Sequence, residues 1–80
     1  MQDTEVLGHI EQLVEEERRL RSDVHGAPDS DPRHKRLHDV EAHLDQCWDL
    51  LRQRRGRRDA GEDPDSAQPR STDVVERYVQ

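Results

Sequence analysis

Two stretches of the chain space their apolar residues as helices do. In the first, these residues recur three, four or seven positions apart, and nothing alternates as a β-strand would. The set is Val6, Leu7, Ile10, Leu13, Val14, Leu20 and Val24. The pattern predicts a helix over residues 3–25, with Asp3 or Thr4 as its N-cap. Glu17 is a charge within the apolar row, and we expect it to reach the helix edge or to pair with a base from another helix.

The second stretch follows a heptad repeat. Two interleaved series recur every seven residues, namely Leu37, Leu44 and Leu51, and Val40, Cys47 and Arg54. This pattern predicts a helix over residues 31–58, with Asp31 as N-cap and Pro32 at the first helical position. Trp48 and Leu50 flank the repeat and widen the apolar face beyond what one partner helix covers.

A short loop over residues 25–32 joins the two predicted helices. Gly26 can take the left-handed conformation that ends a helix, and a loop this short makes its helices antiparallel neighbours. The resulting register places Leu20 near Leu37, Leu13 near Leu44, Ile10 near Cys47, Val6 near Leu51, and Asp3 near Arg54. The predicted fold class is all-α, a coiled-coil-like antiparallel two-helix hairpin over residues 1–58.

A chain of 80 residues buries a modest fraction of its surface, and a lone hairpin of this composition is marginally stable. We therefore expect two hairpins to pair into a four-helix bundle, which makes the protein a homodimer. The residues assigned to the core and the dimer contact are Leu13, Leu20, Leu37, Leu44, Cys47, Trp48 and Leu51.

The composition changes after residue 58. Residues 59–72 have neither periodicity nor bulk and predict a flexible acidic linker. Residues 73–80 predict a short C-terminal docking helix with Val75 and Tyr78 on one face. Two turns of helix are not stable alone in water, so this segment docks on the bundle, docks on a partner, or stays disordered.

Charge is unevenly distributed along the chain. Charged residues make up 40% of the sequence and hydrophobic ones 29%. Residues 1–30 hold eight acids and three bases, residues 31–58 five acids and eight bases, and residues 59–80 six acids and two bases. The acidic ends therefore complement the basic middle before they suit any outside partner.

The strongest sign of function is an arginine run near the end of the second helix. It consists of Arg52, Arg54, Arg55, Arg57 and Arg58. Intramolecular or intersubunit pairing is the favoured interpretation, and Arg54 can pair with Asp3 or Glu5 across the hairpin. For an outside partner, we predict a protein bound through the run, Val75 and Tyr78, which makes the chain a dimeric adaptor or regulator. The alternative is a nucleic-acid or ribosome-associated protein that places the arginines on phosphates.

Other chemistry is sparse. His34 and His38 lie four residues apart on the second helix and are weak candidates for a divalent metal, although a solvated helix face explains them as well. Cys47, the single cysteine, cannot form an intramolecular disulfide and is expected to be an inert core residue. No phosphate loop or Ser/His/Asp arrangement is present, so we expect neither an enzyme nor a cofactor.

The chain has no targeting or membrane segment. Its start lacks the basic and apolar regions of a signal peptide, and no apolar run reaches the ~18 residues that a membrane span needs. We expect a cytoplasmic protein with no membrane partner.

One run is unusual enough to suggest relatives. Residues 44–55, LDQCWDLLRQRR, followed by Arg58, Asp59, Ala60, Gly61, Asp63 and Pro64, resemble a family of small actinobacterial proteins catalogued as a domain of unknown function. Residues 10–20 and 75–78 are also similar, so the resemblance covers nearly the whole chain. It implies a short cytoplasmic actinobacterial protein and carries over no activity, cofactor or catalytic residue.

Overall fold

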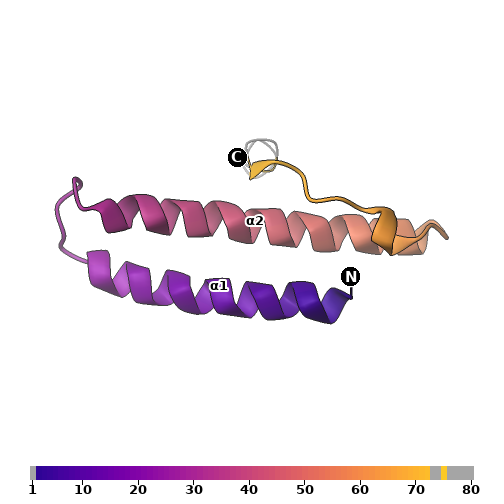
Figure 1. The fold of residues 1–80 in the computed structure, drawn as a ribbon, viewed down its shortest axis with the longest axis horizontal. Helices are drawn as coiled ribbons and strands as arrows, with labels where there is room; N and C mark the ends of the chain where they lie inside the picture. Colours follow the sequence, from indigo (N-terminus) through magenta and orange to yellow (C-terminus); the bar gives the residue numbers. More distant parts are fainter. Residues whose placement is uncertain (1, 73–74, 76–80) are drawn as a thin grey trace.

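The molecule is an antiparallel pair of helices with a tail that returns along one of them (Figure 1). The computed structural model describes residues 2–72 and residue 75. Helix α1 spans Asp3–Val24, α2 spans Pro32–Asp59, and a short 3-10 helix, η1, spans Pro64–Ser66. Within these described residues there is no strand. The predicted all-α hairpin is confirmed, and each helix bound falls within one residue of the expected position.

The start of α1 corrects one detail of the prediction. The N-cap is Gln2, whose main-chain N–H donates to Glu5 Oε1 at 3.3 Å, rather than Asp3 or Thr4. Asp3 lies inside the first helical turn, and its carboxylate is bonded to a side chain of α2 instead of capping its own helix. The Asp3 side chain, which the sequence suggested as an N-cap, therefore makes a tertiary contact instead.

The loop between the helices is built as predicted. Gly26 has a φ of +78°, the left-handed conformation expected just after α1. Asp31 caps α2, because its Oδ1 accepts a hydrogen bond from the main-chain N–H of Arg33 at 2.9 Å, and Pro32 takes the first helical position. Both signals are local, so they could be predicted without knowledge of the tertiary structure.

Helix α2 ends in a sharp reversal of the chain. Gly61 has a φ of +77°. The N–H of Glu62 donates to the carbonyl of Arg57 at 2.7 Å, and the N–H of Gly61 donates to the carbonyl of Arg58 at 3.1 Å. These two bonds form a Schellman motif, which satisfies the last helical carbonyls and turns the chain back toward α2.

Two glycines near the end of α2 predict stability changes of opposite sign. Gly61→Ala should lower the free energy of unfolding by about 1–2 kcal/mol, because alanine is strained in the left-handed region. Gly56→Ala should raise it by about 1 kcal/mol, because Gly56 lies inside the helix and an added Cβ meets no atom within 4 Å. Urea unfolding followed by circular dichroism measures both changes, and a shared sign would contradict the turn described here.

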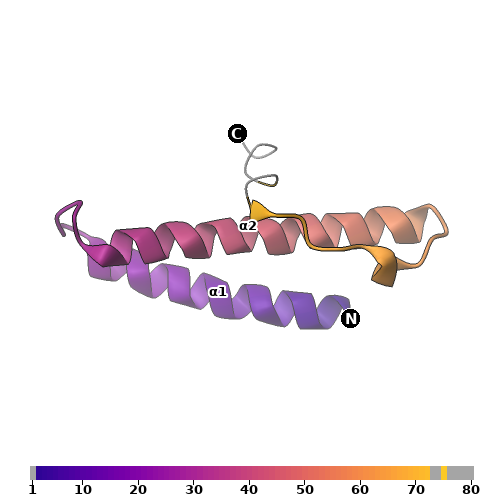
Figure 2. The ribbon, with the colours of Figure 1, turned by 45° about the horizontal axis from the view of Figure 1, so that its top comes forward.

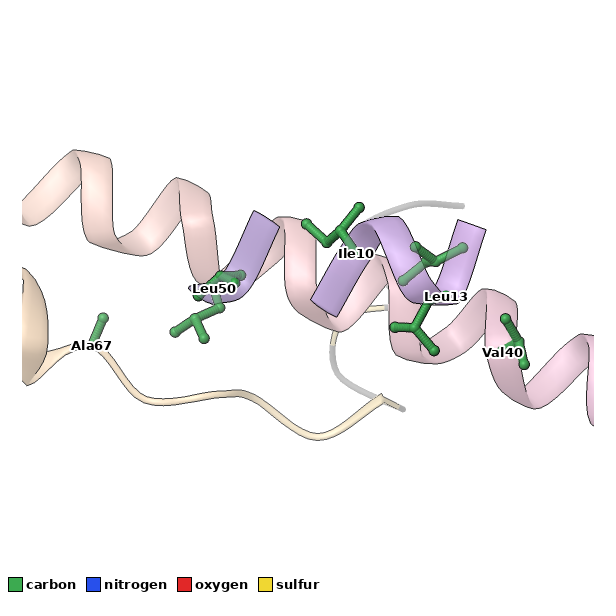
Figure 3. Close-up of a cluster of buried hydrophobic side chains, with 7 residues drawn as sticks. Ile10, Leu13, Val40, Leu50 and Ala67 are labelled. Carbon is green, nitrogen blue, oxygen red and sulfur yellow. The ribbon is translucent and has the colours of Figure 1, made fainter. Parts of the chain in front are cut away.

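The apolar rows of the two helices meet in one cluster. Its buried members are Val6, Ile10, Leu13, Val40, Leu44, Leu50 and Ala67, and Leu20, Cys47 and Leu51 pack against them. Figure 3 shows the cluster, with Ala67 reaching from the tail toward Leu50 of α2. Five of the residues assigned to the core from the heptads therefore belong to it, and the tail adds one more that the heptads did not indicate.

Ion pairs between the helices confirm the predicted register. At the open end of the hairpin, Arg54 Nε donates to Asp3 Oδ1 at 2.6 Å, the pairing expected from the sequence. Nearer the loop, Arg36 Nη2 lies 2.6 Å from Glu16 Oε1. A slip of α1 along α2 would break both pairs as well as expose the apolar cluster.

Glu17, the charge within the apolar row of α1, pairs on its own helix. Arg21 Nη2 lies 3.2 Å from Glu17 Oε2, at the i, i+4 spacing that brings side chains together on a helix. The same guanidinium reaches Glu41 of α2 at 3.5 Å. Within the single chain, Glu17 thus pairs with a base of its own helix, and Arg21 links it to α2.

The tail turns back and follows α2 (Figures 1 and 2). Ala67 is 7% exposed and Val75 is fully buried, and Gln46 Nε2 donates to the main-chain carbonyl of Arg70 at 2.7 Å. The flexibility expected of residues 59–72 stays a prediction, but this segment lies against the helices rather than away from them. Of the short helix predicted over residues 73–80, the described part of the chain includes Val75 alone.

Candidate functional site

The arginine run lies at the open end of the hairpin, where α1 begins and η1 returns to α2. The structure divides its five members by exposure. Arg54 is 4% exposed, Arg57 is half-buried, and Arg52, Arg55 and Arg58 are exposed. The run is therefore not a single basic surface, and its second member, Arg54, is internal, as its place in the heptad repeat and its predicted pairing with Asp3 indicated.

Arg54 joins three segments of the chain through its guanidinium. Besides the bond to Asp3 of α1, its Nη1 donates to Asp65 Oδ1 at 2.8 Å and to the carbonyl of Pro64 at 3.3 Å. Arg58 Nη2 adds a bond to Asp3 Oδ2 at 2.8 Å. The planar fork of a guanidinium suits such a site, because its five N–H groups can serve several acceptors at once. We term Asp3, Arg54, Arg58 and Asp65 the arginine clamp.

The arginine clamp keeps its carboxylates ionised. The hydrogen bond from Arg54, followed by that from Arg58, holds the pKa of Asp3 below its ordinary value of 3.8. The hydrogen bond from Arg54 also lowers the pKa of Asp65. At the start of α2, Arg33 lowers the pKa of Asp31 to about 2. These shifts mean that the native state favours the charged carboxylates more than the unfolded chain does.

The lowered carboxyl pKa values predict acid sensitivity. The stability that Asp3 and Asp65 contribute is complete above their ordinary pKa, and it is lost as the pH falls through their lower native values. The urea midpoint should therefore be steady from pH 7 to pH 5 and fall below about pH 4. In the double variant with Asp3→Asn and Asp65→Asn, the urea midpoint should fall less steeply below about pH 4. The fall that remains should come from Asp31. An unchanged slope in the double variant would contradict the assignment.

The other arginines differ in what they contact. Arg57 Nη1 lies 3.5 Å from Glu62 Oε2, across the turn that follows α2. Arg58 belongs to the arginine clamp. Arg52 and Arg55 are exposed and form no ion pair with the described part of the chain. Intramolecular pairing thus accounts for Arg54, Arg57 and Arg58, and leaves two cations facing solvent.

Among the described residues, three large apolar side chains stay exposed. Leu7 is 42% exposed, Val14 46% and Trp48 45%. Leu7 and Val14 are seven residues apart on α1, hence on one side of that helix. Trp48 was assigned to the core and dimer contact together, and the structure places it outside the core of the single chain. An exposed tryptophan beside two exposed aliphatic residues is a feature that often marks an interaction site.

These exposed residues lie on the face of the hairpin away from the tail. On the tail side, a groove is lined by Glu5, Val6, His9, Gln46, Cys47, Leu50 and Pro69. One position along a helix is a rotation of 100° around its axis. Leu7 is therefore rotated by 100° from Val6, away from Glu5. Trp48 is rotated by 100° from Cys47, away from Gln46. The two-helix layer thus has one face covered by the tail and another that carries Leu7, Val14 and Trp48, which we term the tryptophan face.

Comparison with known proteins places the chain in a family. Residues 2–80 match the family described as "Protein of unknown function (DUF2630)". The chain belongs to the DUF2630 family. Uncharacterized proteins of Mycobacterium tuberculosis and Mycobacterium bovis are each 48% identical to it over 78 residues, which is 96% of this chain and 90% of the relative. No solved structure matches it at a significant level. The resemblance to an actinobacterial family of unknown function is confirmed.

The last residues of the run that suggested the DUF2630 family form the turn after α2. Gly61 ends the helix, and Asp63 caps η1 by accepting a hydrogen bond from the N–H of Asp65 at 2.9 Å. Pro64 takes the first position of η1. The turn thereby brings the Asp65 carboxylate to Arg54. In this DUF2630 protein, the end of that run therefore builds a chain reversal.

The candidate metal ligands do not gain further partners from the fold. His34 is half-buried, with its Nε2 buried and without a hydrogen-bond partner, while His38 is exposed. Among the described residues, no three or more His, Cys, Asp or Glu side chains gather as a metal site requires. Metal binding by His34 and His38 therefore rests on their sequence spacing.

Cys47 and the tail residues complete the set of candidates. Burial raises the pKa of the Cys47 thiol, which disfavours the reactive thiolate. Val75 is fully buried, and its N–H donates to the carbonyl of Ser71 at 3.1 Å, whereas Tyr78 lies outside the described residues.

In the part of the chain that the structure describes, no helix has the length and apolarity to cross a membrane.

Proposed function

We propose that this DUF2630 protein is a non-catalytic interaction module that works as a homodimer in the cytoplasm. The observation that carries the proposal is the tryptophan face. The molecule is 14 Å thick in its thinnest direction, not much more than one helix. Leu7, Val14 and Trp48 consequently have no second layer over them in the single chain, and removing them from water stabilises any assembly that covers them.

The register of the hairpin favours a second copy as the cover. The pairing of Asp3 with Arg54 sets Trp48 level with the turn of α1 between Leu7 and Val14. A two-fold axis parallel to the helices lays α1 of one copy over α2 of the other at the same level. Trp48 of each copy then enters between Leu7 and Val14 of the other, in an isologous contact that completes a four-helix bundle.

The two exposed arginines are the proposed contact for a further protein. Arg52 and Arg55 follow Trp48 by four and seven positions, so they border the tryptophan face toward the open end of the bundle. Because they form no ion pair with the described residues, their guanidinium groups are proposed to bind carboxylates of an acidic segment. A dimer presents two such pairs, as suits an adaptor or a regulator.

Binding to phosphates is the alternative use of the same two arginines. Two exposed cations per chain form a small site for a nucleic acid, and the other three arginines of the run already contact carboxylates. Phosphate binding weakens steeply with added salt. If mixed RNA and DNA bind at low salt, and Arg52→Ala with Arg55→Ala abolishes the binding, the nucleic-acid function replaces the protein partner.

Light scattering of a face variant tests the proposed dimer. The unmodified chain should elute at twice its monomer mass of 9.4 kDa, and Trp48→Glu should elute as a monomer with the same helical circular dichroism. Gln12→Glu introduces the same charge at an exposed position of α1 outside the tryptophan face, and it should remain dimeric. A dimer that survives Trp48→Glu would rule out the tryptophan face as its contact.

A further inference from the structure

The tail lies against α2 and forms one wall of a groove between the helices. We term residues 67–72 the arm. In its first part, Ala67 joins the apolar cluster (Figure 3). Pro69 lines a groove with Val6 and Leu50. The arm lies on the face opposite the tryptophan face, so it is independent of the proposed dimer contact.

Two glutamines of α2 hold the arm by its main chain. Gln53 Nε2 donates to the carbonyl of Gln68 at 3.0 Å, and Gln46 Nε2 donates to the carbonyl of Arg70 at 2.7 Å. The glutamines are seven residues apart, so both amides lie on one side of the helix. Because the acceptors are main-chain carbonyls, these bonds recognise an extended backbone whatever its side chains are.

Asp49 gives the groove its charge preference. It lies between the two glutamines and is 7% exposed. Its Oδ2 accepts a hydrogen bond from Gln53 at 2.9 Å and lies 3.4 Å from Arg70 Nε. A carboxylate buried this deeply needs an opposite charge beside it. Whatever segment fills the groove must therefore bring a cation to this position.

The arm and the turn before it are held by different groups. The turn is fixed by Arg54 through the Pro64 carbonyl and through Asp65, three residues before the first glutamine contact at Gln68. Release of the arm therefore leaves the arginine clamp in place. It would uncover Leu50 and the Asp49 carboxylate, which supply an apolar floor and a charge for a new ligand.

We propose that this groove binds an extended segment of a partner protein and that the arm is its built-in competitor. The arm defines the ligand chemistry as a small residue, a proline two positions later and a cation directly after it, as in Ala67, Pro69 and Arg70. The segment of the partner can bind in the groove only after it displaces the arm. The groove is thus a second binding surface, with its access regulated by the chain itself.

A labelled peptide tests the groove in the full chain. The probe is a fluorescein-labelled peptide with the sequence of residues 65–75, and fluorescence anisotropy gives its affinity. Arg70→Glu in the protein sets two negative charges together at Asp49 and loosens the arm. The variant should bind the probe at least about ten-fold more tightly than the unmodified chain, whose groove is occupied. Adding Gln46→Ala and Gln53→Ala to Arg70→Glu should reverse that gain.

Each outcome decides the proposal. Two results would overturn the proposal if circular dichroism shows that the helices are intact. One is that the Arg70→Glu variant and the unmodified chain bind the probe with equal affinity. The other is that replacing the two glutamines leaves the affinity for the probe unchanged. A probe with glutamate in place of the arginine should not bind. Light scattering should give the Arg70→Glu variant the same mass as the unmodified chain. A lower mass would mean that the arm of a second copy fills the groove instead.

Discussion

Arg54→Ala is expected to lower the thermal midpoint of unfolding by at least about 5 °C, more than replacement of any other arginine in the chain. The side chain is 5% exposed, and its guanidinium contacts Asp3 of α1 together with Asp65 and Pro64 beside α2. Its removal frees both the start of α1 and the tail turn. It also leaves a gap where the aliphatic part of the side chain was packed. Differential scanning calorimetry on the dilute protein measures the change.

Three further variants separate charge, shape and position. Arg54→Lys keeps a cation but loses the planar fork, so its midpoint should fall between those of the unmodified chain and Arg54→Met. Arg54→Met keeps an apolar side chain of similar length and should be more stable than Arg54→Ala. Arg19→Ala removes an exposed arginine of α1 and should leave the midpoint within about 2 °C. A loss for Arg19→Ala equal to that for Arg54→Ala would contradict the special role of the arginine clamp.

Leu44→Ala should cost about 2–5 kcal/mol of unfolding free energy. Leu44 is 7% exposed and lies in the cluster that joins the two helices. A chain of 80 residues has a total stability of about 4–12 kcal/mol, so this variant should be partly unfolded at room temperature. Urea titration followed by helical circular dichroism gives the loss.

Leu7→Ala provides the matched control, because it makes the same chemical change at a site that is 42% exposed. In dilute protein it should cost less than about 1 kcal/mol, since much of the deleted group is already in water. At high concentration the cost should grow, because Leu7 then belongs to the proposed dimer contact. Equal losses for Leu44→Ala and Leu7→Ala in dilute protein would mean that the helices pack in another register.

Local signals and the heptads predicted the hairpin. Asp31 and Pro32 mark the start of α2, and Gly26 marks the end of α1, through bonds that depend on neighbours in sequence. The seven-residue period gave the register well enough to place Asp3 beside Arg54. These features are predictable because helix geometry alone converts spacing along the chain into position around it.

The packing of the tail was not predictable by the same means. Gln46 and Gln53 hold main-chain carbonyls, and no pattern of apolar residues encodes such contacts. One signal was available. Asp63 and Pro64 repeat the cap-and-proline pair that starts α2, and with Gly61 they predict a second chain reversal. A tail that turns back at that point passes Arg54, which would have indicated Asp65 as a second partner of Arg54 beside Asp3.

The proposed dimer is tested most directly by isotope-filtered NMR on an equal mixture of labelled and unlabelled chains. Such an experiment detects contacts between copies and suppresses those within one copy. The proposed bundle predicts cross-peaks from the Trp48 ring of one copy to the methyl groups of Leu7 and Val14 of the other. A sample at high concentration that gives no cross-peaks between copies, or gives them from the arm instead, would contradict the tryptophan face as the dimer contact.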